Sequence, residues 1–215
     1  MSCSTKKHKL VQSDTSLVHS DTLIVSNLIQ KSNKLGTNLI PIDKEIFTST
    51  QRYQILCWTV KNWEGYSPNS YKCSAGKRTV AWGDTHIKSV KNIHHADRIF
   101  KRIIAGLFKD VSKAYPKITY FQKSAIVSLL YNCGNLEKIK NSGFSRHLLN
   151  NNIPKAIAKF KLWSSVHVDN KTIAVKGLVN RRKYESKLLD GSFDMNDYLS
   201  LKNDVASIYL ENRGK

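Results

Sequence analysis

Acidic residues are scarce in this chain. Its 215 residues include 16 Asp and Glu against 35 Lys and Arg, a net charge of +19. The excess is concentrated in residues 49–190, which carry 26 bases and eight acids, whereas residues 1–48 and 191–215 are close to neutral. Such a domain attracts polyanions: nucleic acid, an anionic membrane, or bacterial wall polymers with carboxylates and phosphates. Charge alone does not choose among them.

Cysteine is also sparse, and its four positions are scattered. No Cys-x-x-Cys pair or histidine cluster accompanies Cys3, Cys57, Cys73 and Cys133, which argues against a zinc site and against a dense disulfide framework. We therefore expect neither a metal nor a cofactor. Cys57 and Cys133 lie in apolar helical contexts and are predicted to be buried free thiols.

Long hydrophobic runs are missing. The most apolar early stretch, Leu23 to Ile29, is interrupted by Ser26 and Asn27 and is too short to span a bilayer. We expect the protein to be synthesised in a cytoplasm and not to insert into a membrane.

Three regions differ in their patterning. Residues 1–48 are rich in Ser, Thr, Lys and Asn and predict a weakly structured extension, either an attachment segment or an idle tail. Residues 49–190 carry the periodic apolar pattern of a domain. Residues 191–215 form a C-terminal extension, expected to be helical.

Helical periodicity in the domain begins near Thr50 and runs to Glu64. Between Gly65 and Gly83 it disappears, and the turn residues there favour a β-hairpin or a three-stranded sheet. Every later segment is predicted to be helical, with Thr119 and Gln122 forming a capping box and Gly134 a helix stop. These patterns predict an α+β fold, with a small sheet lobe, a larger helical lobe and a cleft between them.

Glu64, at the end of the first predicted helix, is a candidate proton donor. Burial beside Trp63 would favour its neutral carboxyl, as a proton donor near neutral pH requires. Cys73 and Thr79 fall in the predicted sheet and can fold back toward the helix end. An acid, a thiol and a hydroxyl suit acetal hydrolysis, although most such trios at arbitrary spacing carry no function.

The segment from Val60 to His86 resembles the catalytic signature of phage-type lysozymes, the muramidases and endolysins of glycoside hydrolase family 24. Their pattern is Glu-Gly at a helix end, eight residues, Asp or Cys, five residues, then Thr, and here it falls on Glu64, Cys73 and Thr79. The accompanying residues also fit: Trp63, Tyr71, Gly76 and the pair Trp82-Gly83.

The resemblance extends over roughly residues 50–190. Residues 121–134, 143–163 and 177–189 resemble, in order, the family's central helix, the segment leading to its tryptophan, and its Gly-Leu-x-Asn-Arg-Arg block. Two positions depart from it, since Ala81 replaces a glycine and Asp84 replaces a histidine, for which His86 is a nearby substitute.

The resemblance implies inverting hydrolysis of the β-1,4 bond between N-acetylmuramic acid and N-acetylglucosamine in peptidoglycan. Glu64 is then the general acid, Cys73 the water-activating group and Thr79 the residue that holds the water. Arg181 is implied as the cation that orients Glu64, with Tyr71 and Trp82 as substrate-binding or orienting residues. The alternative for Arg181 and Arg182 is that they decorate a solvated helix face.

Two other classes of function compete. A nucleic-acid-binding helical domain would cluster bases on one helix with stacking aromatics, a motif that this chain lacks, so no specific nucleic acid is expected. A lysozyme-like structural or wall-binding virion protein with little turnover is the second. An enzyme would act on the periplasmic wall, either as a lysis endolysin or as a virion component attached to other virion proteins through residues 1–48.

Overall fold

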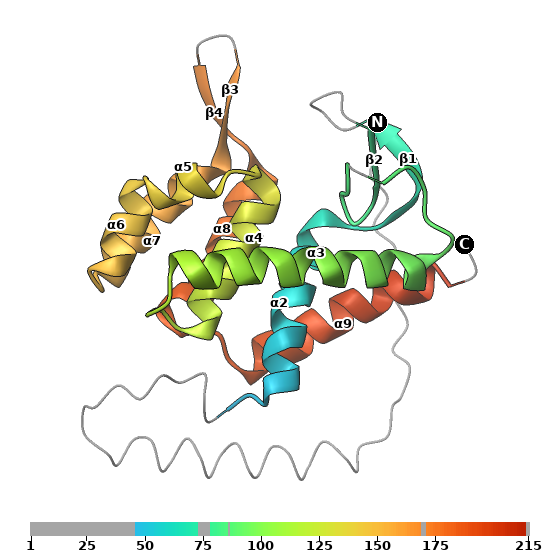
Figure 1. Ribbon diagram of the computed structural model, residues 1–215, viewed down its shortest axis with the longest axis horizontal. Helices are drawn as coiled ribbons and strands as arrows, with labels where there is room; N and C mark the ends of the chain where they lie inside the picture. The colour runs from blue at the N-terminus through green and yellow to red at the C-terminus, as the bar shows by residue number, and fades with distance from the viewer. Residues whose placement is uncertain (1–45, 73–77, 86, 169–170, 214–215) are drawn as a thin grey trace. The chain divides into compact units, whose positions relative to one another are not determined.

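The computed structural model describes residues 46–72, 78–85, 87–168 and 171–213. All of these belong to one unit of the chain, residues 41–215. Cys73, Gly76 and His86 lie outside the described residues, as does the predicted extension up to residue 45. Figure 1 labels the helices and strands, which in chain order are α2 Ser49–Glu64, β1 Ser67–Lys72, β2 Arg78–Ala81, α3 Ile93–Ala114, α4 Tyr120–Cys133, α5 Leu136–Lys140, α6 Gly143–Leu149, α7 Ile153–Lys161, the 3-10 helix η2 Leu162–Ser164, β3 Ser165–Val168, β4 Lys171–Ala174, α8 Lys176–Asp190 and α9 Met195–Glu211.

The fold is α+β and mostly helical, as the patterning predicts. Helix α4 is its centre: eight of its 14 residues are buried, and it packs against α2, α3 and α8. The predicted capping box is confirmed, because the Thr119 hydroxyl accepts from the Gln122 backbone and the Gln122 side chain accepts from the Thr119 N–H. Gly134 ends α4 in the left-handed conformation that glycine adopts readily.

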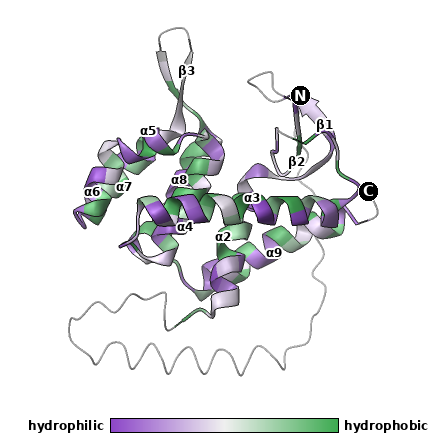
Figure 2. Ribbon diagram, viewed as in Figure 1, coloured by the Kyte–Doolittle hydropathy of each residue, from purple (hydrophilic) through white to green (hydrophobic). Residues whose placement is uncertain are grey.

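Helix α3 shows most clearly why these segments are helical. Hydrophilic and hydrophobic residues alternate along it in the stripes that Figure 2 colours. Its buried side chains, which face the core, are Ile93, Ala96, Phe100, Ile104 and Val111. No helix in the described part of the chain combines the length and the apolarity needed to cross a lipid bilayer.

The predicted hairpin is present as β1 and β2, which pair antiparallel with Tyr71 opposite Thr79. A second antiparallel hairpin, β3 and β4, contradicts the expectation that everything after Gly83 is helical. The alternating stretches Ser165–Val168 and Lys171–Ala174 have the β-branched composition of strands. Each is only four residues long, which is too short for that alternation to stand out between two helical patterns.

The C-terminal part of the chain belongs to the core. Helix α9 packs against α2, and its Tyr198, Leu201 and Val205 are buried. At the other end, the Phe47 ring contacts the rings of Phe121, Phe193 and Tyr198. The structured domain therefore begins before residue 49 and includes α9.

The two cysteines that the structure describes differ in exposure. Cys57 is buried within α2, as predicted, and burial raises the pKa of its thiol to about 11. Cys133 is exposed, so the prediction that it is buried is wrong. It is the last residue of α4, next to Gly134, which ends the helix in the left-handed conformation.

Candidate active site

Glu64 is the last residue of α2. The helix ends there because Gly65 adopts a φ of +67°, while its N–H still bonds the Lys61 carbonyl. The Glu64 side chain is 19% exposed, so it is shielded but not sealed from solvent. A carboxyl at this position is accessible to a ligand but only partly hydrated.

Arg181 of α8 meets Glu64 from the helical lobe. Its Nη1 donates to Glu64 Oε1 at 2.6 Å, across 117 positions of sequence. The arginine is 3% exposed, so it does not decorate a solvated helix face. The structure thus brings together the predicted acid and its predicted cationic partner.

The Arg181 guanidinium also bonds residues of α8 and α4. Its Nε donates to Glu185 Oε1 at 3.0 Å, and its Nη2 donates to the Ser128 carbonyl and hydroxyl, each at 3.1 Å. The Ser128 hydroxyl donates in turn to Glu185 at 2.5 Å. Burial lowers the pKa of Arg181, but Glu185 and Glu64 together outweigh it, and the net shift is upward. The group facing Glu64 is therefore a fixed cation.

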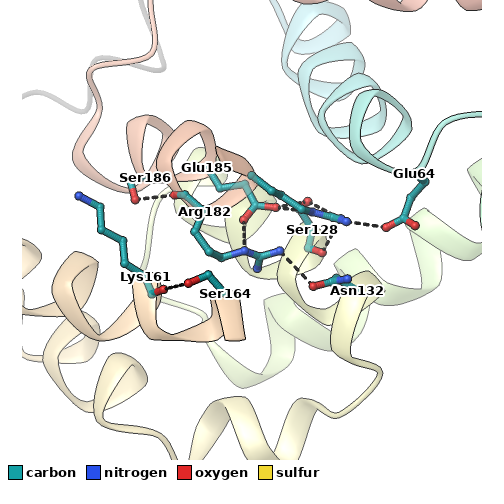
Figure 3. A network of polar contacts seen from close by, with 9 residues as sticks. Glu64, Ser128, Asn132, Lys161, Ser164, Arg182, Glu185 and Ser186 are labelled. Atoms are coloured by element: carbon teal, nitrogen blue, oxygen red, sulfur yellow. Dashed lines mark hydrogen bonds and ion pairs between the residues drawn. The ribbon is translucent and has the colours of Figure 1, made fainter. Parts of the chain in front are cut away.

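Arg182 completes the network away from Glu64 (Figure 3). It is fully buried, with Nε 3.2 Å from Glu185 Oε2 and Nη2 donating to Asn132 Oδ1 at 3.2 Å. Its guanidinium lies 5.3 Å from the centre of the Phe160 ring. Burial lowers the pKa of Arg182, and the neighbouring Arg181 acts in the same direction while Glu185 opposes both. Arg182 supports the buried carboxylate and does not reach Glu64.

The loop after β2 closes on Glu64 from the other side. Gly83 has a φ of +84°, and a Cβ there would lie 2.9 Å from Glu64 Oε2. The preceding residue, Trp82, is 1% exposed, and its carbonyl accepts from the Tyr131 hydroxyl at 2.8 Å. Burial leaves no face of the Trp82 indole open to a ligand, so of the two roles predicted for it, substrate binding or orienting, only the orienting role is compatible with its position, and that role stays a prediction. Its place is in the core beneath the loop.

The other predicted site residues are distributed along the first hairpin. Thr79 is buried on β2 and pairs in register with Tyr71 of β1, which is 44% exposed. Cys73 lies outside the described residues, so the spacing of Glu64, Cys73 and Thr79 in space stays a prediction. Tyr71 is open to a ligand, whereas Thr79 sits at the inner side of the hairpin.

The two departures from the family pattern have structural counterparts. Ala81 has a φ of +56°, a left-handed conformation that costs a residue with a Cβ roughly 1–2 kcal/mol and explains why glycine suits this position. Asp84 is 7% exposed; its backbone pairs with Val80, and its Oδ1 accepts from the Ile87 N–H. Asp84 thus organises the loop.

Sequence reasoning missed Ser128, Glu185 and Lys61, all of them buried polar residues. Glu185 had a recognisable signal, since it follows Arg181 by four positions and Arg182 by three, the spacings that place side chains together on a helix. Ser128 and Lys61 had none, because their partners are distant in sequence.

Residues 61–185, more than half of the chain, match the family model of phage lysozyme. The chain belongs to the phage lysozyme family. Its members hydrolyse the glycan strands of peptidoglycan, so this protein is a glycosidase of the lysozyme type that acts on the bacterial cell wall. An endolysin of Acyrthosiphon pisum secondary endosymbiont phage 1 is 27% identical over 137 residues, which are 62% of this chain and 93% of that protein.

Solved structures show the same fold. The endolysin from Escherichia coli O157:H7 phage FAHEc1 superposes with a TM-score of 0.57 at 24% identity, covering 69% of this chain and 96% of that one. The muramidase domain of SpmX from Asticaccaulis excentricus also gives a TM-score of 0.57, at 19% identity, with 63% and 95% of the two chains covered. Helix α9 lies beyond the family-matched residues.

Proposed function

We propose that this lysozyme hydrolyses the β-1,4 bond between N-acetylmuramic acid and N-acetylglucosamine with inversion, using Glu64 as the general acid. The observation that carries the proposal is the contact between Glu64 and the buried Arg181 at the end of α2. Arg181 engages Oε1, so the proton to be delivered belongs on Oε2, the oxygen beside Gly83. Protonation of the glycosidic oxygen then releases the leaving sugar.

The water-activating group in this proposal is Cys73. An inverting glycosidase separates its two groups by roughly 6.5–9.5 Å so that a water fits between them. A free thiol has a pKa of about 8.5 and is a weak base at neutral pH. Lys72, Lys77 and Arg78 flank the cysteine in sequence and favour the thiolate. Thr79 aligns the water, and Tyr71 offers an exposed ring to the substrate.

The basic surface suits the proposed encounter with the wall. Residues 49–190 carry a net charge of +18, which attracts the carboxylates and phosphates of the envelope and makes association sensitive to salt. We propose that the protein is made in the host cytoplasm and serves either lysis or virion-associated wall penetration. In the second case, residues 1–48 attach it to other virion proteins.

The bond that is cleaved can be read from the products. Mass analysis of digested peptidoglycan should give fragments with N-acetylmuramic acid at the new reducing end, and NMR of the first product should show the α-anomer, as inversion requires. Glu64→Gln should abolish release of these fragments. A β-anomeric first product would contradict inversion, and digestion by Glu64→Gln would contradict the role of Glu64.

Position 73 has its own test. Cys73→Asp restores a carboxylate and should keep activity, whereas Cys73→Ala should lose most of it, both assayed on the same labelled peptidoglycan. If Cys73→Asp is as inactive as Glu64→Gln, the role proposed for position 73 is wrong. A wild-type protein that binds the wall without releasing fragments would instead indicate a structural virion component.

A further inference from the structure

Lys61 is a lysine where a lysine is rarely found. It lies on α2, one turn before Glu64, and its side chain is only 2% exposed. Lysines are almost never this buried unless their charge is paired. The groups that compensate the buried charge of Lys61 therefore show which parts of the fold the residue connects.

The Lys61 ammonium has two polar partners and three aromatic ones. It forms an ion pair with Asp97 of α3 and donates to the Tyr209 hydroxyl at 2.7 Å. It also lies 4.8 Å from the centre of the Trp82 ring, 5.0 Å from that of Phe100 and 5.1 Å from that of Tyr209. Cation–π attraction is strongest in such desolvated sites.

This aromatic enclosure lies directly behind the loop that shapes the acid. Trp82, one of its walls, immediately precedes Gly83, where an added Cβ would lie 2.9 Å from Glu64 Oε2. The buried Trp82 indole is packed too closely to turn about its side-chain bonds without displacing its own backbone, and that backbone shares a peptide plane with Gly83. The same plane is anchored at the Trp82 carbonyl, which accepts from the Tyr131 hydroxyl. The position of the indole therefore bears on the room left for the Glu64 carboxyl.

Tyr209 is the contribution of α9 to the enclosure. Its hydroxyl bonds both Lys61 and Asp97, the latter at 2.9 Å, and its ring centre lies 5.9 Å from that of Trp82. Helix α9 follows the family-matched part of the chain, which ends at residue 185. A helix outside the family core thus reaches the last turn of the helix that carries the acid.

We propose that Tyr209 is a positioning residue for catalysis: by holding Lys61 and Trp82 it fixes the Gly83 backbone against Glu64 and so sets the orientation of the acid. The inference rests on the proposed function of Glu64. It assigns to α9 a role in turnover in addition to its role in the core.

The test compares two tyrosines of α9 that each bond a residue of α2. Tyr209→Phe removes the hydroxyl that bonds Lys61, whereas Tyr198→Phe removes the hydroxyl that donates to Gln54 at 2.9 Å. Both variants keep the ring, lose one hydroxyl that bonds α2 and leave Glu64 untouched, although the Tyr209 hydroxyl also bonds Asp97 of α3. The full-length proteins are assayed on soluble peptidoglycan fragments, well below the midpoint of thermal unfolding measured for each.

We expect the two variants to differ in kcat but not in thermal stability. Tyr209→Phe should lower kcat roughly three- to tenfold with little change in KM, because small displacements at a reacting group slow turnover more than binding. Tyr198→Phe should lower the unfolding midpoint comparably while kcat stays at the wild-type value. Unchanged kcat in Tyr209→Phe, or an equal loss in both variants, would overturn the proposal.

A double-mutant cycle tests whether the effect passes through Lys61. Lys61→Met removes the ammonium while Asp97 keeps its ion pair with Lys101 at 2.8 Å. In that background, Tyr209→Phe should change kcat little further, whereas simple multiplication of the two losses would contradict the route. Glu64→Gln separates the two failures: if it is inactive while Tyr209→Phe is normal, only the positioning role falls. If Glu64→Gln is active, the proposed function falls.

Discussion

Glu64 and Arg181, 117 positions apart in the chain, meet through a hydrogen bond of 2.6 Å between Oε1 and Nη1. One end of this pair is partly open to solvent, and the other is embedded in a network of buried residues on α4 and α8. The arrangement anchors the carboxyl through Oε1 and leaves Oε2 for the proton transfer that we propose.

Substitutions of Arg181 and Arg182, which are neighbours on α8, should affect catalysis and stability differently. Arg181→Lys and Arg182→Lys each keep the charge but lose the planar fork that bonds Glu185, so each should lower the free energy of unfolding by about 1–3 kcal/mol. Only Arg181 contacts Glu64, and only its substitution should lower kcat, by roughly 10- to 100-fold. Urea unfolding and the peptidoglycan assay measure the two effects. An equal loss of kcat in Arg182→Lys would contradict a specific role for Arg181.

Gly83 should tolerate no side chain. Gly83→Ala places a Cβ 2.9 Å from Glu64 Oε2 and forces alanine to a φ of +84°, so kcat should fall at least tenfold. Gly134→Ala is the matched control, because its φ of +70° imposes similar strain while no atom lies within 4 Å of the added carbon. Both should cost roughly 1–2 kcal/mol of stability. Normal turnover in Gly83→Ala would show that the loop does not constrain the acid.

The ion pair at Asp97 should make stability depend on acid pH. Burial by itself raises the pKa of Asp97, but hydrogen bonds from Lys101, Lys61 and Tyr209 outweigh it, and the net shift is downward. Because the folded-state pKa is below the unfolded value of about 3.9, the stabilisation is present above that pH and is lost as the pH falls through the folded-state value. Urea unfolding of the wild type and Asp97→Asn should therefore differ most above about pH 4 and converge below it. Asp110→Asn, which removes a carboxylate at an exposed position of the same helix, is the control for the substitution itself.

The two described cysteines should react very differently. At pH 8 the buried Cys57, with its pKa raised to about 11, should resist iodoacetamide in the native protein, while the exposed Cys133 is alkylated. Peptide mapping by mass spectrometry identifies the modified residues, and both should react after unfolding in urea. Rapid labelling of native Cys57 would show that α2 opens readily.

The sequence alone determined the elements whose signals are local. Thr119 with Gln122 predicts the start of α4, apolar spacing predicts α2, and the Glu64, Cys73 and Thr79 spacing with the Arg-Arg block predicts the family. These features can be predicted from the sequence because capping, amphipathic periodicity and motif spacing depend on residues a few positions apart. The β3 and β4 strands were not predicted because four residues are too few for their alternation to stand out, and the exposure of Cys133 was not predicted because it depends on how neighbouring elements pack.

Only the tertiary structure decided which polar residues share a buried site. It showed that Arg181 and Arg182 are the partners of Glu185, placed the Trp82 indole in the core, and joined Lys61 to Asp97 and Tyr209. The reason is energetic. A buried charge is stable only beside a partner that replaces its hydration, and that partner comes from whichever helix the fold brings near, at any distance along the chain.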